Sequence, residues 1–307
     1  MRLILLYTDF DSGNSSRPHL FSVTEKSPTR TNANVNMVWK DSDSISSMGT
    51  PHIVWSIPAI HADLVQLVRL HDMIFSRIKP GDRIIYHGNY TGYGERAVAC
   101  LDEILAFRRM VLALPGMLPS DIVYLRGQQE LIWEKLLQIQ FAPDPTNVLL
   151  WMLGNGLTNT LYDYGLSPHD GIDACKTGIM GLTKWTNSIR KALRAHPGHE
   201  TFMNQLKRMA VTDKSAPAPM LFVHAGLNIE RALHEQGDDI WWATDNFRKI
   251  EHPYAPFTKV VRGFDPDHGG MYLNGVSATV DDGCGFGGQL ISVGFDPDGA
   301  AAHILEA

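Results

Sequence analysis

Short apolar runs, each followed by a loop and then by an amphipathic segment, occur three times in the first half of the chain. The runs at 52–57, 84–86 and 122–125 have the length of buried β-strands. After the second run, helical spacing is kept by Val98, Leu101, Ile104 and Leu105. Repeated strand, loop and helix units predict an α/β fold whose loops gather along one edge of a sheet, where α/β proteins place their sites.

The second half of the chain has a different pattern. Residues from about 131 to 215 are predicted to be mostly helical, with segments near 131–141, 146–153, 172–195 and 200–210. Strand-like runs then follow at 220–223, 259–262, 277–280 and 289–295. Gly and Asp turns separate the later runs, so we expect antiparallel strands that complete a second sheet.

Residues 1–50 differ in composition from the rest of the chain. Residues 2–7 are predicted to form a strand, and 11 to about 50 are rich in Ser, Asn, Thr, Asp, Gly and Pro. Such a segment buries little apolar surface, so we expect a surface excursion or a flexible arm. We therefore divide the chain into an N-terminal strand and Ser/Asn/Thr-rich arm at 1–50 and a globular domain at 51–307.

Composition narrows the class of protein. The 307 residues are 44% hydrophobic and 20% charged, which is ordinary for a soluble globular protein. A net charge of −6 argues against a nucleic-acid or membrane partner. The three scattered cysteines form no CxxC pair, and the apolar start of the chain is too short for a signal peptide or a membrane span. These features predict a cytoplasmic protein.

Five loop sequences carry the candidate chemistry. They are 55–59 (WSIPA), 88–94 (GNYTGYG), 125–130 (LRGQQE), 223–227 (VHAGL) and 262–266 (RGFDP). In order and spacing, over roughly 52–296, they resemble the ligand loops of the calcineurin-like metallophosphoesterases, specifically the bacterial Ser/Thr protein phosphatase branch. The resemblance implies a four-layer α/β/β/α sandwich of two mixed sheets, with a helical insertion at about 131–215.

Working members of this family hold two metal ions, and the resemblance shows which ligands this chain has lost. Five of six ligand positions are changed: Ser56 and Pro58 replace Asp and His, Asn89 replaces the bridging Asp, Gln128 replaces Asn, and Phe264 replaces His. Only His224 is retained. Hard oxygen and imidazole donors are what such ions require, and a single imidazole is too little to hold one. We therefore predict no bound metal and no cofactor, and a structural role for His224.

Other positions that the family uses for chemistry have changed too. Gly92 stands at the second Asp of the second loop, and Tyr93 stands at the phosphate-binding Arg. Gln129 stands at the catalytic His, and glutamine cannot act as a general acid near neutral pH. With Arg126, these residues would leave a neutral, hydrogen-bonding vestigial pocket and no catalytic residue.

Three functions are compatible with this pattern. The leading hypothesis is a catalytically inactive phosphatase-like protein, a pseudophosphatase, that binds a protein partner or a phosphorylated ligand through its arm and helical insertion. An active phosphoesterase with a rearranged metal site would need a convergent cluster among His61, His87, His224, Asp265 and Asp281. A sensor of phosphate or a nucleotide would use the vacated pocket.

Overall fold

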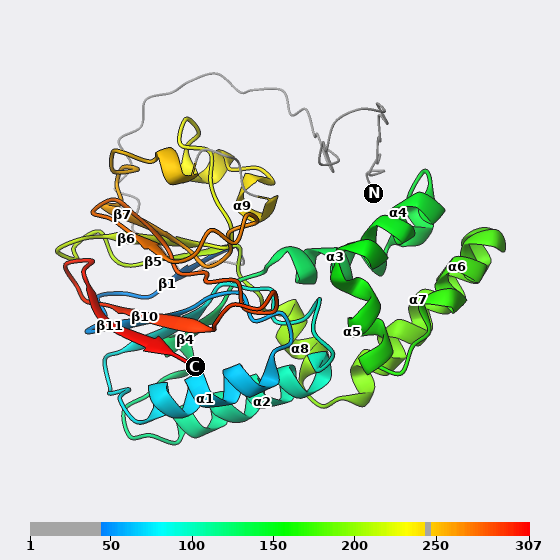
Figure 1. Ribbon diagram of the computed structural model, residues 1–307, viewed down its shortest axis with the longest axis horizontal. Helices are drawn as coiled ribbons and strands as arrows, with labels where there is room; N and C mark the ends of the chain where they lie inside the picture. The colour runs from blue at the N-terminus through cyan, green and yellow to red at the C-terminus, as the bar shows by residue number, and fades with distance from the viewer. Residues whose placement is uncertain (1–43, 243–246) are drawn as a thin grey trace.

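The structure is a computed structural model that describes residues 44–242 and 247–307, so the predicted strand at 2–7 and most of the arm lie outside the described residues. Two mixed sheets pack face to face, as predicted (Figure 1). The first sheet contains, in spatial order, β11 (Ala301–Glu306), β10 (Ile291–Phe295), β2 (Val54–Ile57), β3 (Arg83–Tyr86) and β4 (Ile122–Tyr124). The second contains β1 (Ile45–Ser47), β5 (Met209–Val211), β6 (Met220–Val223), β7 (Lys259–Arg262), β9 (Ser277–Thr279) and β8 (Tyr272–Leu273).

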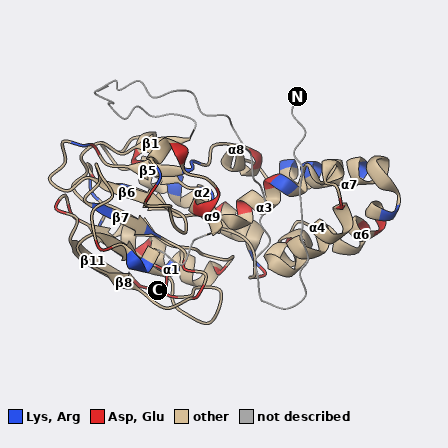
Figure 2. Ribbon diagram, turned by 90° about the horizontal axis from the view of Figure 1, so that it is seen from above, with Lys and Arg blue, Asp and Glu red and all other residues tan. Residues whose placement is uncertain are grey.

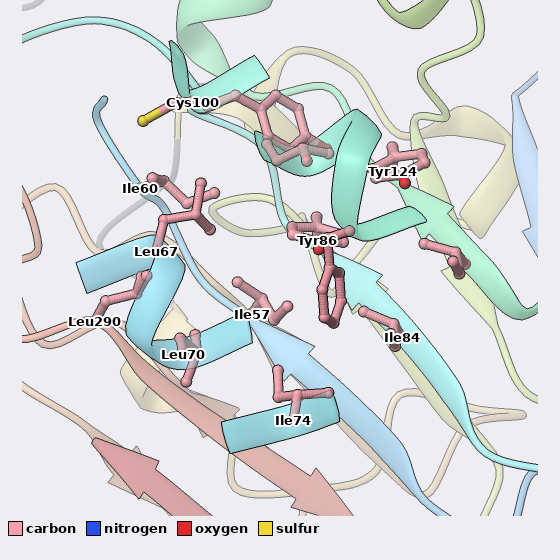
Figure 3. Close-up of a cluster of buried hydrophobic side chains, with 14 of the residues drawn as sticks. Ile57, Ile60, Leu67, Leu70, Ile74, Ile84, Tyr86, Cys100, Tyr124 and Leu290 are labelled. Carbon is pink, nitrogen blue, oxygen red and sulfur yellow. The ribbon is translucent and has the colours of Figure 1, made fainter. Parts of the chain in front are cut away.

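Alternation along the strands divides the apolar residues between the layers. In β3, Ile84 and Tyr86 face helices α1 (Leu64–Phe75) and α2 (Ala97–Leu112), which cover the outer face of the first sheet (Figure 3). Ile85 faces the other way, into the core between the sheets. This period of two is what a strand buried on both faces requires.

The outer face of the second sheet is covered by a less regular layer. It contains α9 (Asp239–Trp242) and the 3₁₀ turns at Leu233–Glu235 and Phe247–Lys249, which pack on β5, β6 and β7. The four layers are therefore helices, sheet, sheet and a thin layer of short helices. This confirms the predicted fold class.

Helices between β4 and β5 form a second lobe with its own apolar core. They are α3 (Gln128–Leu136), α4 (Pro145–Met152), α5 (Thr158–Asp163), α6 (Pro168–Lys176) and α7 (Gly178–Ala195), with a short turn at Ile139–Phe141 and a π-helical segment at Leu153–Leu157. The next helix, α8 (His199–Asn204), contributes Phe202 to the core of the first sheet, and a separate short turn at Pro119–Asp121 precedes β4. Figures 1 and 2 show α4, α6 and α7 projecting away from the sandwich. None of the helices within 44–242 and 247–307 is long and apolar enough to span a bilayer.

Some predicted elements are wrong. The helix expected at 200–210 ends at Asn204, and β5 follows it. The end of the arm, at Ile45–Ser47, is a strand that pairs in parallel with β5. Both strands have three residues, too few for a periodic signal.

The strands near the C-terminus do not form one antiparallel group. β7 pairs in parallel with β6 and β9, whereas β10 joins the first sheet antiparallel to β2. Turn residues mark where strands end, but packing against the cores decides which partner each strand takes.

Candidate functional site

The loops after β2, β3, β4, β6 and β7 meet at one edge of the sandwich. Ile60 N–H and His61 N–H both donate to the carbonyl of Asn89, at 3.0 and 2.8 Å. Gly88 lies against Gly127 so closely that a Cβ on Gly88, whose φ is +95°, would lie 2.3 Å from the Gly127 nitrogen. Glycine is thus required where the second and third loops cross.

Glu130 holds these two loops together. Its fully buried carboxylate accepts hydrogen bonds from the backbone N–H groups of Asn89 (2.8 Å), Tyr90 (2.9 Å) and Gly127 (2.9 Å). Burial raises the pKa of Glu130, and the three N–H groups oppose that shift. The carboxylate therefore fixes the backbone of the second and third loops and is not available to a ligand.

Ser56, at the position of a metal-binding Asp, is paired with a histidine. Its Oγ lies 2.7 Å from Nε2 of His87, whose Nδ1 lies 2.7 Å from the carbonyl of Val223. A carbonyl only accepts, so Nδ1 carries the ring proton and the serine hydroxyl donates to Nε2. Both side chains are fully buried. Ser56 therefore ties β2 to β3 and, through His87, the first sheet to the second.

His224, the retained family ligand, has protein partners on both ring nitrogens. Nδ1 donates to the carbonyl of His87 at 2.6 Å, and Nε2 accepts the backbone N–H of Gln128 at 3.2 Å. The ring stacks on Phe264, with centroids 5.2 Å apart and planes 9° from parallel. With both nitrogens engaged, no lone pair is left to ligate a metal.

Gln129, at the position predicted for the catalytic histidine, is hydrogen-bonded to two other loops. Its backbone N–H donates to Oδ1 of Asn89 at 3.0 Å, and its side-chain amide donates to the carbonyl of Asn155 at 2.9 Å. The side chain fits between Gly92 and Gly156, where an added Cβ would come within 2.8 and 2.9 Å of it. Gln129 thereby links the third loop to the π-helical segment of the helical lobe.

Aromatic rings fill the centre of the site. His61 makes edge contacts with Tyr93, Phe264 and Phe286, at centroid distances of 5.4, 5.6 and 5.0 Å. His268 packs on Phe286 at 4.1 Å. Tyr93 and Phe286 are partly exposed and lie at the mouth, whereas His61 and Phe264 are buried. We call His61, Tyr93, Phe264, His268 and Phe286 the aromatic cluster.

Three imidazoles of the site are kept neutral by burial. Burial lowers the pKa of His61 to about 3, and nearby His224 and His268 lower it further, against the opposing carbonyl of Thr91. It also lowers the pKa of His224 to about 3 and that of His87 to about 4. His61 Nε2 lies 3.4 Å from the amide nitrogen of Asn89, and within the described ranges its Nδ1 has no hydrogen-bond partner of good geometry.

Three other residues of the predicted site make contacts that do not involve the aromatic cluster or are simply buried. Arg126 forms an ion pair with Glu134 at 2.5 Å, and Pro58 is buried directly after β2. Asp265 is paired with Arg248 and Arg262.

The cluster that a rearranged metal site would need is not formed. The carboxylate of Asp281 accepts the backbone N–H groups of Asp265 and Gly283, at 2.8 and 2.9 Å. Within 44–242 and 247–307, no group of three or more His, Cys, Asp or Glu side chains could hold a metal ion.

Five of the six predicted ligand positions do not fit a pair of metal ions. Phe264 and Pro58 offer no side-chain lone pair, Ser56 donates to His87, and His224 uses both nitrogens. Asn89 directs its carbonyl oxygen to Gln129. We therefore derive no reaction step through metal ions for this site.

Two important residues were missed in the sequence. Glu130 follows Gly127 at the three-residue spacing of a helix capping box, and this signal was available. Phe286 lies in the glycine-rich stretch 283–288, which gives no sign that its ring packs on His61.

Comparisons with known proteins bear on the fold. No protein-family model matches the chain, and no curated protein matches it. Among solved structures, a candidate diadenosine tetraphosphatase, at 16% sequence identity, superimposes with a TM-score of 0.51 over 86% of this chain and 97% of that one.

Two further structures superimpose less well. A serine/threonine phosphatase from Saccharomyces cerevisiae similar to human PP5 gives a TM-score of 0.47 at 13% identity, covering 86% of this chain and 82% of that one. A metallophosphoesterase from Sphaerobacter thermophilus gives 0.43 at 12%, covering 83% and 88%. From the sheet order and the first of these similarities, the chain has the two-sheet α/β fold of the calcineurin-like metallophosphoesterases.

Proposed function

We propose that this protein is a catalytically inactive member of the metallophosphoesterase fold that works by binding a protein partner or a ligand. The observation that carries the proposal is the state of the six ligand positions. Pro58 and Phe264 are apolar, Ser56 is hydrogen-bonded to His87, both ring nitrogens of His224 are engaged, and the side-chain carbonyl of Asn89 accepts the backbone N–H of Gln129. Gln128 alone is a neutral amide, too little to clamp a phosphate through metals.

The helical lobe supports a binding role. Five large apolar or aromatic side chains on its described residues are exposed: Phe141, Leu150, Tyr162, Ile179 and Met180. The lobe also projects from the sandwich, where a partner has access to it (Figure 2). Gln129 connects the lobe to the former catalytic loop, so the two regions are mechanically joined.

The test is metal content together with hydrolysis. The purified, untagged protein is incubated with manganese, zinc and iron, dialysed, and measured by elemental mass spectrometry, with p-nitrophenyl phosphate turnover followed in parallel. The proposal expects neither stoichiometric metal nor turnover. About two metals per chain, with turnover lost in His224→Ala but kept in the exposed His234→Ala, would overturn it, provided that circular dichroism shows both variants folded.

A further inference from the structure

A cavity of about 420 Å³ lies at the edge of the first sheet, outside the site described above. Its lining residues are Ser46, Arg108, Pro119, Ser120, Ile122, Val123, Tyr124, Asn204, Gln205 and Lys207. None of them belongs to the aromatic cluster or to the six ligand positions. The volume falls in the range of small-molecule sites, about 300–1,000 Å³.

The charge of the lining is of one sign. Arg108 and Lys207 are cationic, no lining residue is acidic, and the other polar groups are hydroxyls and amides. In the described part of the chain, no carboxylate pairs with Arg108, whose guanidinium makes a long hydrogen bond, 3.4 Å, to the carbonyl of Pro119 and lies next to the hydroxyl of Tyr124. The nearby Asp121 is paired with Arg83 at 3.1 Å and does not line the cavity. The cavity therefore favours an anion.

The hydroxyl of Tyr124 supplies a second, independent observation. Tyr124 is 4% exposed, and among residues 44–242 and 247–307 its buried oxygen has no hydrogen-bond partner of good geometry. Burial raises the pKa of Tyr124 to about 12, although nearby Arg108 opposes this, so the hydroxyl keeps its proton. A buried donor without a good acceptor is costly, and an oxyanion in the cavity would satisfy it.

We propose that this cavity binds the phosphate group of a small phosphorylated molecule, recognised by Arg108, Lys207 and the hydroxyl of Tyr124. A guanidinium and an ammonium offset the charge of a phosphate, and the surrounding hydroxyl and amide groups complete its hydrogen bonds. The cavity is larger than phosphate alone, and the apolar wall of Pro119, Ile122 and Val123 leaves room for an organic group.

The cavity is also joined to the former catalytic loop. Lys207 N–H donates to the carbonyl of Tyr124 at 2.8 Å, and Arg126 N–H donates to the carbonyl of Lys207 at 2.7 Å. A ligand held by Lys207 would therefore rest on the strand end that leads into Gln128 and Gln129. This binding site goes beyond the proposed function, since it neither requires nor excludes catalysis at the vestigial site.

Isothermal titration calorimetry of the full chain tests the proposal. The probes are inorganic phosphate, ribose 5-phosphate and adenosine monophosphate, with adenosine as the probe that lacks phosphate. We expect saturable binding of the phosphate-bearing probes, weakening with salt, and none of adenosine. Tighter binding of an ester than of inorganic phosphate would support the organic subsite, and equal affinity would overturn that part.

Variants locate the site. Arg108→Gln should weaken phosphate binding by about tenfold or more, as loss of a charge-assisted hydrogen bond predicts. Arg109→Gln, a neighbouring exposed arginine that does not line the cavity, is the matched control and should leave binding unchanged. Tyr124→Phe keeps the ring and should weaken binding by about threefold to tenfold.

Two results would overturn the proposal. One is the absence of saturable phosphate binding in the unmodified protein, or its equal loss in Arg108→Gln and Arg109→Gln. The other is binding that survives Arg108→Gln but is lost in Tyr93→Ala, which would place the ligand at the mouth of the aromatic cluster instead.

Discussion

Mild acid is expected to destabilise this protein steeply, because three buried imidazoles lie together at the site. In the folded chain the pKa values of His61 and His224 are about 3 and that of His87 about 4, against an ordinary value of 6.5. The unfolded chain therefore binds protons that the folded chain does not. The free energy of unfolding is therefore highest above pH 6.5, where the imidazoles are neutral in both states. It decreases as the pH falls from 6.5 towards the pKa values of the folded chain.

The size of the effect follows from the number of protons. Each imidazole that is neutral when folded and charged when unfolded lowers the free energy of unfolding by about 1.4 kcal/mol per pH unit. Three of them lower it by about 4 kcal/mol between pH 7 and pH 5.5, a large share of the 5–15 kcal/mol typical of a domain. Glu130 changes the free energy of unfolding in the opposite direction. Its pKa is raised in the folded chain, so the folded chain takes up a proton more readily than the unfolded chain and is favoured as the pH falls.

Urea unfolding, followed by tryptophan fluorescence at pH 7.0, 6.5, 6.0 and 5.5, measures this slope. The informative variant is His61→Phe, because a phenyl ring keeps the contacts with Tyr93, Phe264 and Phe286 and cannot take up a proton. Averaged between pH 7.0 and 5.5, the slope should fall by about 0.8 kcal/mol per pH unit, whatever the absolute stability, because the unfolded imidazole is only partly charged in this range. The exposed His234→Gln is the control and should leave the slope unchanged. An unaltered slope in His61→Phe would refute the reasoning.

Two further predictions concern the loops, and urea unfolding at pH 7 measures both. Glu130→Gln removes the charge that accepts three backbone N–H groups and should cost about 2–4 kcal/mol, whereas Glu134→Gln, at an exposed ion pair, should cost about 1 kcal/mol or less. Gly263→Ala places a Cβ 2.2 Å from Cβ of His87 and should cost about 3 kcal/mol or more, while Gly154→Ala, with nothing within 4 Å, should be nearly neutral or stabilising. Equal costs within either pair would contradict the packing described for the site.

Where the sequence pattern was strong, the elements were predicted closely. The runs at 220–223 and 259–262 coincide with β6 and β7, because both contain adjacent apolar residues, are bounded by turn residues and are buried along their whole length. The meeting of the loops was also predictable, since parallel neighbouring strands end at the same edge.

Where local pattern was weak, prediction failed. β1 and β5 have three residues each, and β11 exposes most of its side chains, so neither an apolar run nor clear alternation marks them. Their place in the sheets is decided by pairing with strands far away in the sequence. Such pairing leaves no trace in a window of a few residues.

The candidate site was likewise predicted in part. The motif spacing predicted the positions at which ligands are replaced, and that prediction depended only on residue types. Residue types did not predict three contacts: the hydrogen bond from Ser56 to His87, the hydrogen bonds that Glu130 accepts, and the packing of Phe286 on His61. Each of these contacts joins loops that are far apart in the sequence. The assignment of a vestigial site remains a prediction, to be tested by metal content.

The side chains at several of the predicted ligand positions depend on one another for their contacts. Ser56 donates to the lone pair of His87, and a carboxylate at position 56 would pair with that imidazole and raise its pKa before it could serve a metal. Phe264 lies flat on His224, whose nitrogens are held by His87 and Gln128. Restoring one ligand would therefore set a charge among satisfied neutral groups, where burial opposes it. Because Ser56, His224 and Phe264 are held by their neighbours, we expect that a metal site at these positions would require several residues to change together.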